Sequence, residues 1–153
     1  MAEFLHNPVQ SVALNQAAVF DASIPCPKGN VFHVDGTGNF ILRGNTSQCF
    51  ARYQVTFNGN IAVPEGGTLP VGGIAVAISV NGEARPTSRA IYVPAAVGDD
   101  NYGNVTSTAI VTVPKGCCFN VGVRSVPASE SPTATTAPVI NMQNANLIIN
   151  RIA

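Results

Sequence analysis

Hydrophobic and polar residues alternate along several stretches of the chain, as they do in a β-strand with one buried and one exposed face. The clearest stretch is residues 49–57, where apolar or small side chains at the odd positions oppose Arg52, Gln54 and Thr56. Residues 104–113 alternate in the same way and have a threonine-rich second face, which is typical of antiparallel sheet. No segment shows a convincing helical repeat. The pattern therefore predicts an all-β protein.

Residues 74–80 differ because both faces of the predicted strand carry apolar or small side chains. Branched residues on one face oppose Ala75, Ala77 and Ser79 on the other. Small side chains permit the close approach of a second layer, which is either another subunit or the chain's own core. The sequence leaves both interpretations open.

Turn signals separate the predicted strands at short intervals. Asn81-Gly82 is a strong signal for a two-residue hairpin, because both residues tolerate a positive φ. We expect a bend or bulge at Asn58-Gly59-Asn60, which interrupts a long run. The predicted strands are residues 10–20, 31–34, 40–42, 49–63, 74–80, 88–94, 104–113, 118–125 and 139–152. Many short strands joined by tight turns indicate a sandwich or a barrel.

The chain has 153 residues, the size of a single domain. Residues 1–9 show no period and are predicted to form an N-terminal tether, followed by one domain at residues 10–153. Residues 126–138 are rich in Pro, Ser and Thr and are predicted to form an exposed loop. Composition agrees with the strand pattern, since 19 valines and 11 isoleucines stand against 5 leucines.

Charge is scarce and balanced, which excludes several partners. Charged residues are 10% of the chain and the formal net charge is zero, against about 25% charged residues in an average domain. With two lysines, the chain is not expected to bind nucleic acid or an anionic membrane surface. Its longest apolar run is residues 74–78, far short of the roughly 20 residues that span a bilayer, so membrane insertion is not expected. A surface with so little charge suggests subunits packed against one another.

The cysteines and histidines provide few candidates for chemistry. The four cysteines have no C-x-x-C spacing, which argues against a zinc site, and Cys49 is interpreted as a small buried side chain. A disulfide from Cys26 or Cys49 to the adjacent pair 117–118 is left open, although reduced thiols are expected because the N-terminus lacks a secretory signal. His6 and His33 have no catalytic partner at a familiar spacing. We therefore expect no enzymatic activity, no cofactor and no metal.

Several motifs together resemble a known family. Gly38-Asn39-Phe40-Ile41-Leu42, residues 49–57, residues 74–83 with the Asn81-Gly82 turn, and residues 104–116 occur in the order of the jelly roll shared by tumour necrosis factor and the complement globular heads. Residues 49–64, 113–118 and 141–147 are similar to small proteins of gut Firmicutes and their phages, and to the heads of exosporium collagen-like glycoproteins. The Gly-X-Y stem of the exosporium and complement proteins does not occur in this sequence.

This resemblance implies an antiparallel jelly-roll sandwich of about ten strands, assembled as a homotrimer. Trimers of the family pack an apolar axis, so the resemblance places particular side chains at the subunit interface. These are Tyr53, Val55, Phe57, Ala75 and Ala77. It also makes the tether the attachment to other virion proteins, through Phe4, Leu5, His6 and Pro8.

The expected function is that of a non-enzymatic structural protein of a phage virion. The trimer is expected to decorate the capsid or to form a head-fibre or tail-fibre knob that stabilises the particle or contacts the host surface, including a surface glycan. One alternative is a trimeric adhesin-like protein on a bacterial spore or cell surface. Another is a carbohydrate-binding module, although the chain has no Trp and, of three Tyr, only Tyr102 lies in an obvious loop.

Overall fold

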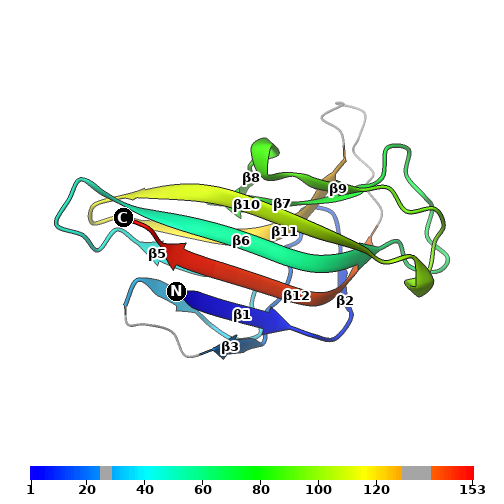
Figure 1. Ribbon diagram of the computed structural model, residues 1–153, viewed down its shortest axis with the longest axis horizontal. Helices are drawn as coiled ribbons and strands as arrows, with labels where there is room; N and C mark the ends of the chain where they lie inside the picture. The colour runs from blue at the N-terminus through cyan, green and yellow to red at the C-terminus, as the bar shows by residue number, and fades with distance from the viewer. Residues whose placement is uncertain (25–28, 129–138) are drawn as a thin grey trace.

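The computed structural model describes residues 1–24, 29–128 and 139–153, which form two antiparallel β-sheets (Figure 1). The first sheet has the order β10-β6-β12-β1-β3, with β2 paired to β12, and the second has the order β4-β5-β11-β7-β8, with β9 paired to β7. The first sheet comprises β1 (Ala2–His6), β2 (Gln10–Val12), β3 (Ala22–Ile24), β6 (Phe50–Ala62), β10 (Gly103–Pro114) and β12 (Ile140–Arg151). The second comprises β4 (Val31–His33), β5 (Phe40–Arg43), β7 (Ile74–Val80), β8 (Glu83–Ala84), β9 (Ala90–Tyr92) and β11 (Cys118–Pro127). The prediction of an all-β protein with sandwich-like sheets is confirmed.

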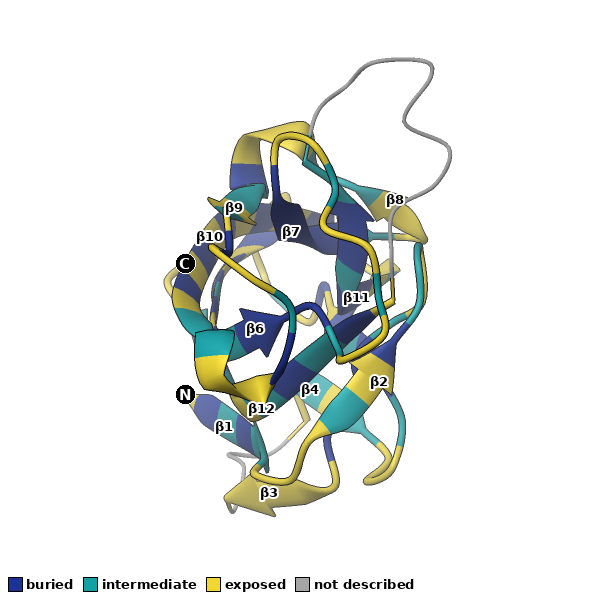
Figure 2. Ribbon diagram, turned by 90° about the vertical axis from the view of Figure 1, so that its right-hand side faces the viewer, coloured by how far each residue is buried: buried dark blue, intermediate teal, exposed yellow. Residues whose placement is uncertain are grey.

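The core lies between the two sheets and follows from the alternation of the long strands. Along β10 buried and exposed residues succeed one another, as Figure 2 shows. The odd positions of β6 are buried because they face the second sheet, whereas most even positions are exposed. Around Phe40, the rings of Phe4 and Phe20 pack at centroid distances of 4.6 Å and 5.4 Å. These tilted and edge-on contacts are a preferred geometry for aromatic rings, and they join β1, β5 and the segment at Phe20 within the core.

The Asn81-Gly82 turn between β7 and β8 has the predicted conformation. Its two residues have φ values of 52° and 86°, as a type I′ turn requires. The bulge near residues 58–60 is present, but the extra residue belongs to β12 and not to β6. Gln143 pairs with Asn60 and Asn146 pairs with Asn58, so β12 has one residue more across this interval. Asn144 accommodates the bulge with a φ of 55°, which asparagine tolerates better than most residues.

Most predicted strands are found near their predicted ends, but the N-terminal third differs. Only Gln10–Val12 of the predicted strand 10–20 is a strand, and its remainder makes isolated bridges at Leu14, Ala17 and Phe20. Strand β3 was not predicted, and all three of its residues are exposed, so no alternation marks it. The predicted loop 126–138 begins within β11, and its residues 129–138 lie outside the described part of the chain.

The predicted tether at residues 1–9 is corrected, because Ala2–His6 is an inner strand. β1 pairs with β12 on one side and with β3 on the other. Ala2 and Phe4 are buried, and Phe4 is only 2% exposed. Two buried positions in a five-residue strand are too few for a readable period, so the sequence alone did not reveal it.

Candidate functional site

The outward positions of the long strands β6, β10 and β12 form one continuous face, which we call the amide–hydroxyl face. Most of its side chains are Asn, Gln or Thr, and Arg52 is its only charged residue. The face consists of Phe50, Arg52, Gln54, Thr56, Asn58, Asn60, Asn104, Thr106, Thr108, Ile110, Thr112, Pro114, Asn141, Gln143, Asn146, Ile148 and Asn150. A sheet face with one charge among these positions is unusual for a surface in contact with water.

Hydrogen bonds between neighbouring strands order the polar side chains of this face. The Thr56 and Thr108 hydroxyl oxygens lie 2.8 Å apart at directly paired positions. Asn104 Nδ2 donates to Asn58 Oδ1 at 2.9 Å and to Asn60 Oδ1 at 3.1 Å. These cross-strand pairs satisfy part of the polar surface before any partner arrives. The cost of desolvating it against a partner is therefore smaller than the cost for free amides or for charges.

Two isoleucines interrupt the polar face on either side of β6. Ile110 on β10 is opposite Gln54 and is 44% exposed, and Ile148 on β12 is opposite Thr56 and is half-buried. At the end of the face, the guanidinium of Arg52 lies 4.9 Å from the centre of the Phe50 ring. The cation is thus covered partly by an aromatic side chain of the same strand. The centre of the face thus combines apolar contact with uncharged polar groups, and a charged side chain adjoins it on each side. Glu3 of β1 is opposite Ile148 and accepts from Asn146 Nδ2 at 2.6 Å, and Arg85 Nη1 donates to Ile110 O at 2.8 Å.

The predicted interface residues on β6 lie on the opposite side of the sheet from this face. Tyr53, Val55 and Phe57 are 0% exposed and belong to the core between the two sheets. A side chain that its own chain buries fully has no surface left for a neighbouring subunit, so their assignment to a trimer interface is corrected. The inward orientation is the physical reason: at these positions alternation marks the chain's own core, not an axis between chains.

Tyr53 also has a polar role inside the chain. Its hydroxyl donates to Arg43 O at 2.6 Å and lies 3.3 Å from Asn30 O. Burial raises the pKa of Tyr53, and the positive charge of Arg151 partly opposes that shift. The hydroxyl therefore ties β6 to β5 and to the segment before β4.

Ala75 and Ala77 lie on the other face of the second sheet, where their own chain covers them. They are 0% and 1% exposed and form a small cluster with Val126, against which Ala84 and Ala128 pack. Of the two interpretations left open for these small residues, close packing within the chain accounts for their burial. Their assignment to a trimer interface is corrected for the same reason as that of the β6 residues.

The predicted attachment residues are largely part of the sheet. Phe4 is in the core, while Leu5 and His6 are half-buried within β1. Pro8 lies between β1 and β2 and is exposed. An attachment through a free tether is therefore corrected, because hydrogen bonds on both edges hold β1 in place.

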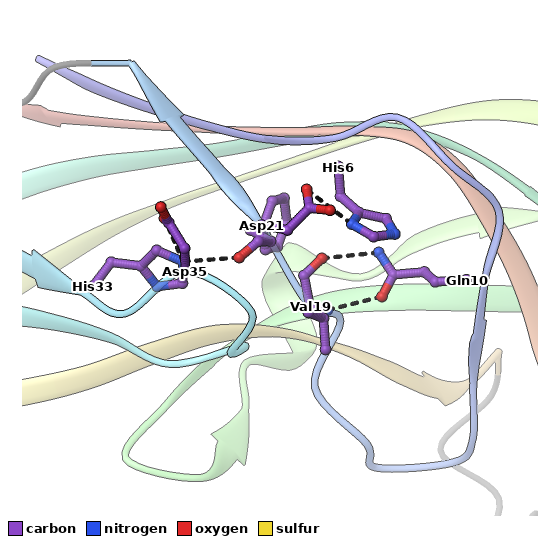
Figure 3. A network of polar contacts seen from close by, with 7 residues as sticks. His6, Gln10, Val19, Asp21, His33 and Asp35 are labelled. Atoms are coloured by element: carbon purple, nitrogen blue, oxygen red, sulfur yellow. Dashed lines mark hydrogen bonds and ion pairs between the residues drawn. The ribbon is translucent and has the colours of Figure 1, made fainter.

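The two histidines and nearby side chains fasten residues 19–21 to the rest of the fold (Figure 3). His6 Nδ1 lies 3.1 Å from Asp21 Oδ1. Gln10 donates from Nε2 to Val19 O at 3.0 Å and accepts from Val19 N at 2.8 Å. The ring nitrogens of His33 lie 2.9 Å from Asn39 O and 3.1 Å from Phe20 O. These side chains mainly hold backbone groups of an irregular segment that has few sheet partners of its own.

His33 is the most enclosed member of this network. Its side chain is 2% exposed and stacks on Phe40 at 4.0 Å with an interplanar angle of 9°. Both ring nitrogens face carbonyl oxygens, whereas a neutral imidazole donates through only one nitrogen. With an aromatic ring stacked on it and a carbonyl oxygen near each nitrogen, His33 acts as a structural clamp between β4 and the segments at Phe20 and Asn39.

The three described cysteines lie at one end of the sandwich and are free and exposed. The interpretation of Cys49 as a buried side chain is wrong, because it precedes the first residue of β6 and projects beyond the cover of the second sheet. Cys117 lies in the turn between β10 and β11, and Cys118 is the first residue of β11. Lys115 N of that turn donates to Cys49 O at 2.9 Å. Cys26 lies outside the described residues. Within the described ranges, no three His, Cys, Asp or Glu residues are grouped so that they hold a metal ion.

Tyr102 lies near the other end of the amide–hydroxyl face, just before β10. Its hydroxyl is 3.5 Å from Asp99 Oδ1, and Asn141 Nδ2 donates to the same oxygen at 3.2 Å. Burial raises the pKa of Tyr102, and the negative charge of Asp99 raises it further. The structure thus brings one half-buried aromatic ring together with an exposed carboxylate and an amide.

The sequence showed the polar side of this face without indicating its importance. Its signal was the threonine-rich alternation of residues 104–113, together with the low overall charge. Pairing β6 between β10 and β12 joins three polar stripes into one surface, and only the fold provides that pairing.

Comparison with known proteins adds no family name to this geometry. No protein-family model matches the chain, and a search of curated proteins finds no significant match.

In the part of the chain that the structure describes, no helix is both long and apolar enough to cross a membrane.

Proposed function

We propose that the chain is a non-enzymatic structural protein of a phage virion. In this proposal it forms a jelly-roll homotrimer that decorates the capsid or makes the knob of a head or tail fibre. The observation that carries the proposal is the amide–hydroxyl face, a broad ordered surface to which β6, β10 and β12 contribute a single charged residue, Arg52. Its location on the virion follows from the resemblance to phage and exosporium proteins in residues 49–64, 113–118 and 141–147.

The path of the chain supports a jelly roll. From β5 onward the long strands alternate between the sheets, with β5, β7 and β11 in the second sheet and β6, β10 and β12 in the first. Strands distant in sequence become neighbours, because β12 lies between β1 and β6, and β11 lies between β5 and β7. Long connections that return a strand beside an earlier one are the mark of Greek-key sandwiches, of which the jelly roll is the double form.

The composition of the amide–hydroxyl face supports self-association through β6, β10 and β12. Packing it against a second copy buries amides and hydroxyls that are already paired in part, and Arg52 is the only charged residue that β6, β10 and β12 contribute to it. Ile110 and Ile148 supply apolar contact at the centre of each copy. Closed rotational symmetry requires only that the face meet another surface of the neighbour, repeated three times.

The mass of the purified chain in solution, measured by light scattering, tests the trimer. We expect a mass of three chains. Replacing Ile110 or Ile148 by Glu is expected to shift the mass towards one chain, because each variant buries an unpaired charge in the interface. Ile91→Glu is the matched control, since Ile91 is 52% exposed on β9 of the second sheet. A wild-type monomer would overturn the trimer, and equal effects of all three variants would move the interface away from this face.

Attachment to capsid or tail proteins is proposed at the exposed turn that contains Pro8, since the rest of the N-terminal segment belongs to β1.

The genes that lie beside this one distinguish a virion protein from a spore-surface protein. Capsid, portal and tail genes support a virion, and spore-coat genes support a surface adhesin.

A carbohydrate-binding module is the second candidate, and the cluster at Tyr102 is the observation in its favour. A half-buried aromatic ring beside a carboxylate and an amide offers both stacking and hydrogen bonds to a sugar. A glycan array probed with the wild type and with Tyr102→Ala tests it. Binding that Tyr102→Ala abolishes supports this function, and the absence of binding to every glycan rejects it.

A further inference from the structure

Three free cysteines are exposed at one end of the sandwich, next to the end of the amide–hydroxyl face. Phe50 and Pro114 are paired and form the last row of that face. Cys49 directly precedes Phe50, and the turn with Cys117 and Cys118 directly follows Pro114 (left-hand end of Figure 1). All three thiols are free and exposed, although free cysteine is among the residue types most often buried.

The two adjacent cysteines are poorly placed to form a disulfide with each other. Consecutive Cα atoms are about 3.8 Å apart, whereas disulfides usually join Cα atoms at least about 4.4 Å apart. The structure also leaves Cys49 unpaired, although Lys115 of the cysteine-containing turn donates to its carbonyl. Exposed thiols that are unpaired within their chain are available to thiols of another chain.

We propose that this end of the molecule is a site of covalent cross-linking between copies, in which Cys49 of one chain forms a disulfide with Cys117 or Cys118 of its neighbour. The inference rests on the proposed homotrimer, because packing through the amide–hydroxyl face brings the same end of each copy to one pole of the assembly. The neighbouring row of Phe50 and Pro114 makes these cysteines the closest described thiols to that interface.

The exposed thiols lie on two different segments of the chain, so a disulfide between two copies can join two different cysteines. A disulfide between identical cysteines joins two chains of a trimer and leaves the third free. A disulfide from Cys49 to the Cys117–Cys118 pair uses a different cysteine on each side, so three such bonds close a covalent ring around a threefold axis. The arrangement therefore supports a trimer that becomes covalently locked as a whole.

The oxidant is a small-molecule disulfide, and the reaction proceeds by two thiol–disulfide exchanges. A protein thiolate attacks the small disulfide, forms a mixed disulfide and releases one small thiolate. The thiolate of the neighbouring chain then attacks the protein sulfur of that mixed disulfide and releases the second small thiolate. Two electrons pass from the two protein sulfurs to the oxidant, and each cross-link consumes two protein thiols.

The full-length protein, incubated with oxidised glutathione and then alkylated, is examined by non-reducing gel electrophoresis and intact mass. We expect a covalent species of three chains that reductant returns to single chains. Cys49→Ser is expected to abolish the covalent trimer, and one of Cys117→Ser and Cys118→Ser is expected to do the same. Cys26→Ser is the control that keeps it.

Light scattering in reductant, carried out on the same samples, separates the two proposals. A trimer in reductant that gives only single chains after oxidation overturns the cross-link and leaves the trimer intact. A monomer in reductant that gives no covalent trimer overturns both. A covalent trimer that persists in Cys49→Ser overturns the assignment of the bond.

Discussion

Single side chains hold the irregular parts of this fold where sheet pairing is sparse. His33 is enclosed by Phe4 and Phe40 and reaches backbone carbonyls on two other segments, at Phe20 and Asn39. Tyr53 has a similar role at the end of β6, where its hydroxyl reaches carbonyls at Asn30 and Arg43. In both cases a buried side chain adds a polar contact to backbone carbonyls of two segments, and two of these carbonyls, Phe20 O and Asn30 O, also accept from a backbone N–H.

Replacing His33 by Ala is expected to lower the free energy of unfolding by about 2–4 kcal/mol, because the change removes the buried ring that packs on Phe4 and Phe40 and the polar contacts of its nitrogens. Urea unfolding at a fixed protein concentration measures the change. Val34→Ala is the control, since Val34 is 53% exposed, and it is expected to change the value by less than about 1 kcal/mol. Similar losses in both variants would argue against the clamp.

The raised pKa of Tyr53 predicts a loss of stability at high pH. Burial disfavours the phenolate in the folded chain, so above the ordinary pKa of 10.0 the unfolded chain releases the Tyr53 proton more readily. Its contribution is therefore fully present below that pH and is lost as pH rises through the folded-state pKa. Unfolding measured between neutral and alkaline pH should show this decline, and Tyr53→Phe should reduce its slope. An unchanged slope in Tyr53→Phe would show that the Tyr53 hydroxyl does not cause this decline.

At the scale of elements, β1 shows how pairing can make a strand of a segment that carries little pattern. Its five residues lie between β12 and β3, and Phe4 joins the aromatic cluster at Phe40. The long strands were predictable because each alternates over many residues. β1 and β3 were not, since short strands gain their identity from the neighbours to which they hydrogen-bond.

Phe4→Ala separates a strand from a tether. Loss of a buried aromatic side chain is expected to lower the free energy of unfolding by about 3–5 kcal/mol, whereas a change in a free tether would leave it unaltered. Val9→Ala is a suitable control, because Val9 lies just after β1 and is 48% exposed. Chemical denaturation of the wild type and the two variants measures the difference in unfolding free energy. A Phe4→Ala variant as stable as the wild type would support the prediction of a free tether.

At the scale of the whole molecule, the two faces of the first sheet have separate roles. The inner face supplies the core through Tyr53, Val55 and Phe57, while the outer face carries amides, hydroxyls and two isoleucines. The sequence pattern distinguished these faces correctly. The family resemblance assigned the apolar face to a neighbouring subunit, because trimers of the family pack around an apolar axis. The fold shows that the chain buries this face in its own core.

A trimer that assembles through the amide–hydroxyl face should become more stable as its concentration rises. Dissociation accompanies unfolding in such an assembly, so mass action raises the thermal midpoint with protein concentration. Calorimetry over a wide range of concentrations, in reductant, measures this shift, and Ile110→Glu is expected to abolish it. A midpoint independent of concentration in the wild type would contradict a dissociating trimer.

The sequence by itself determined the all-β class, the long strands and the hairpin at Asn81-Gly82, because alternation and turn chemistry act over a few adjacent residues. Tertiary structure decided what lies side by side. It placed β1 inside a sheet, moved the bulge to Asn144 on β12, and brought Cys49 beside the turn that contains Cys117 and Cys118. These features depend on contacts between residues far apart in the chain, and local periodicity carries no information about which distant strands will pair.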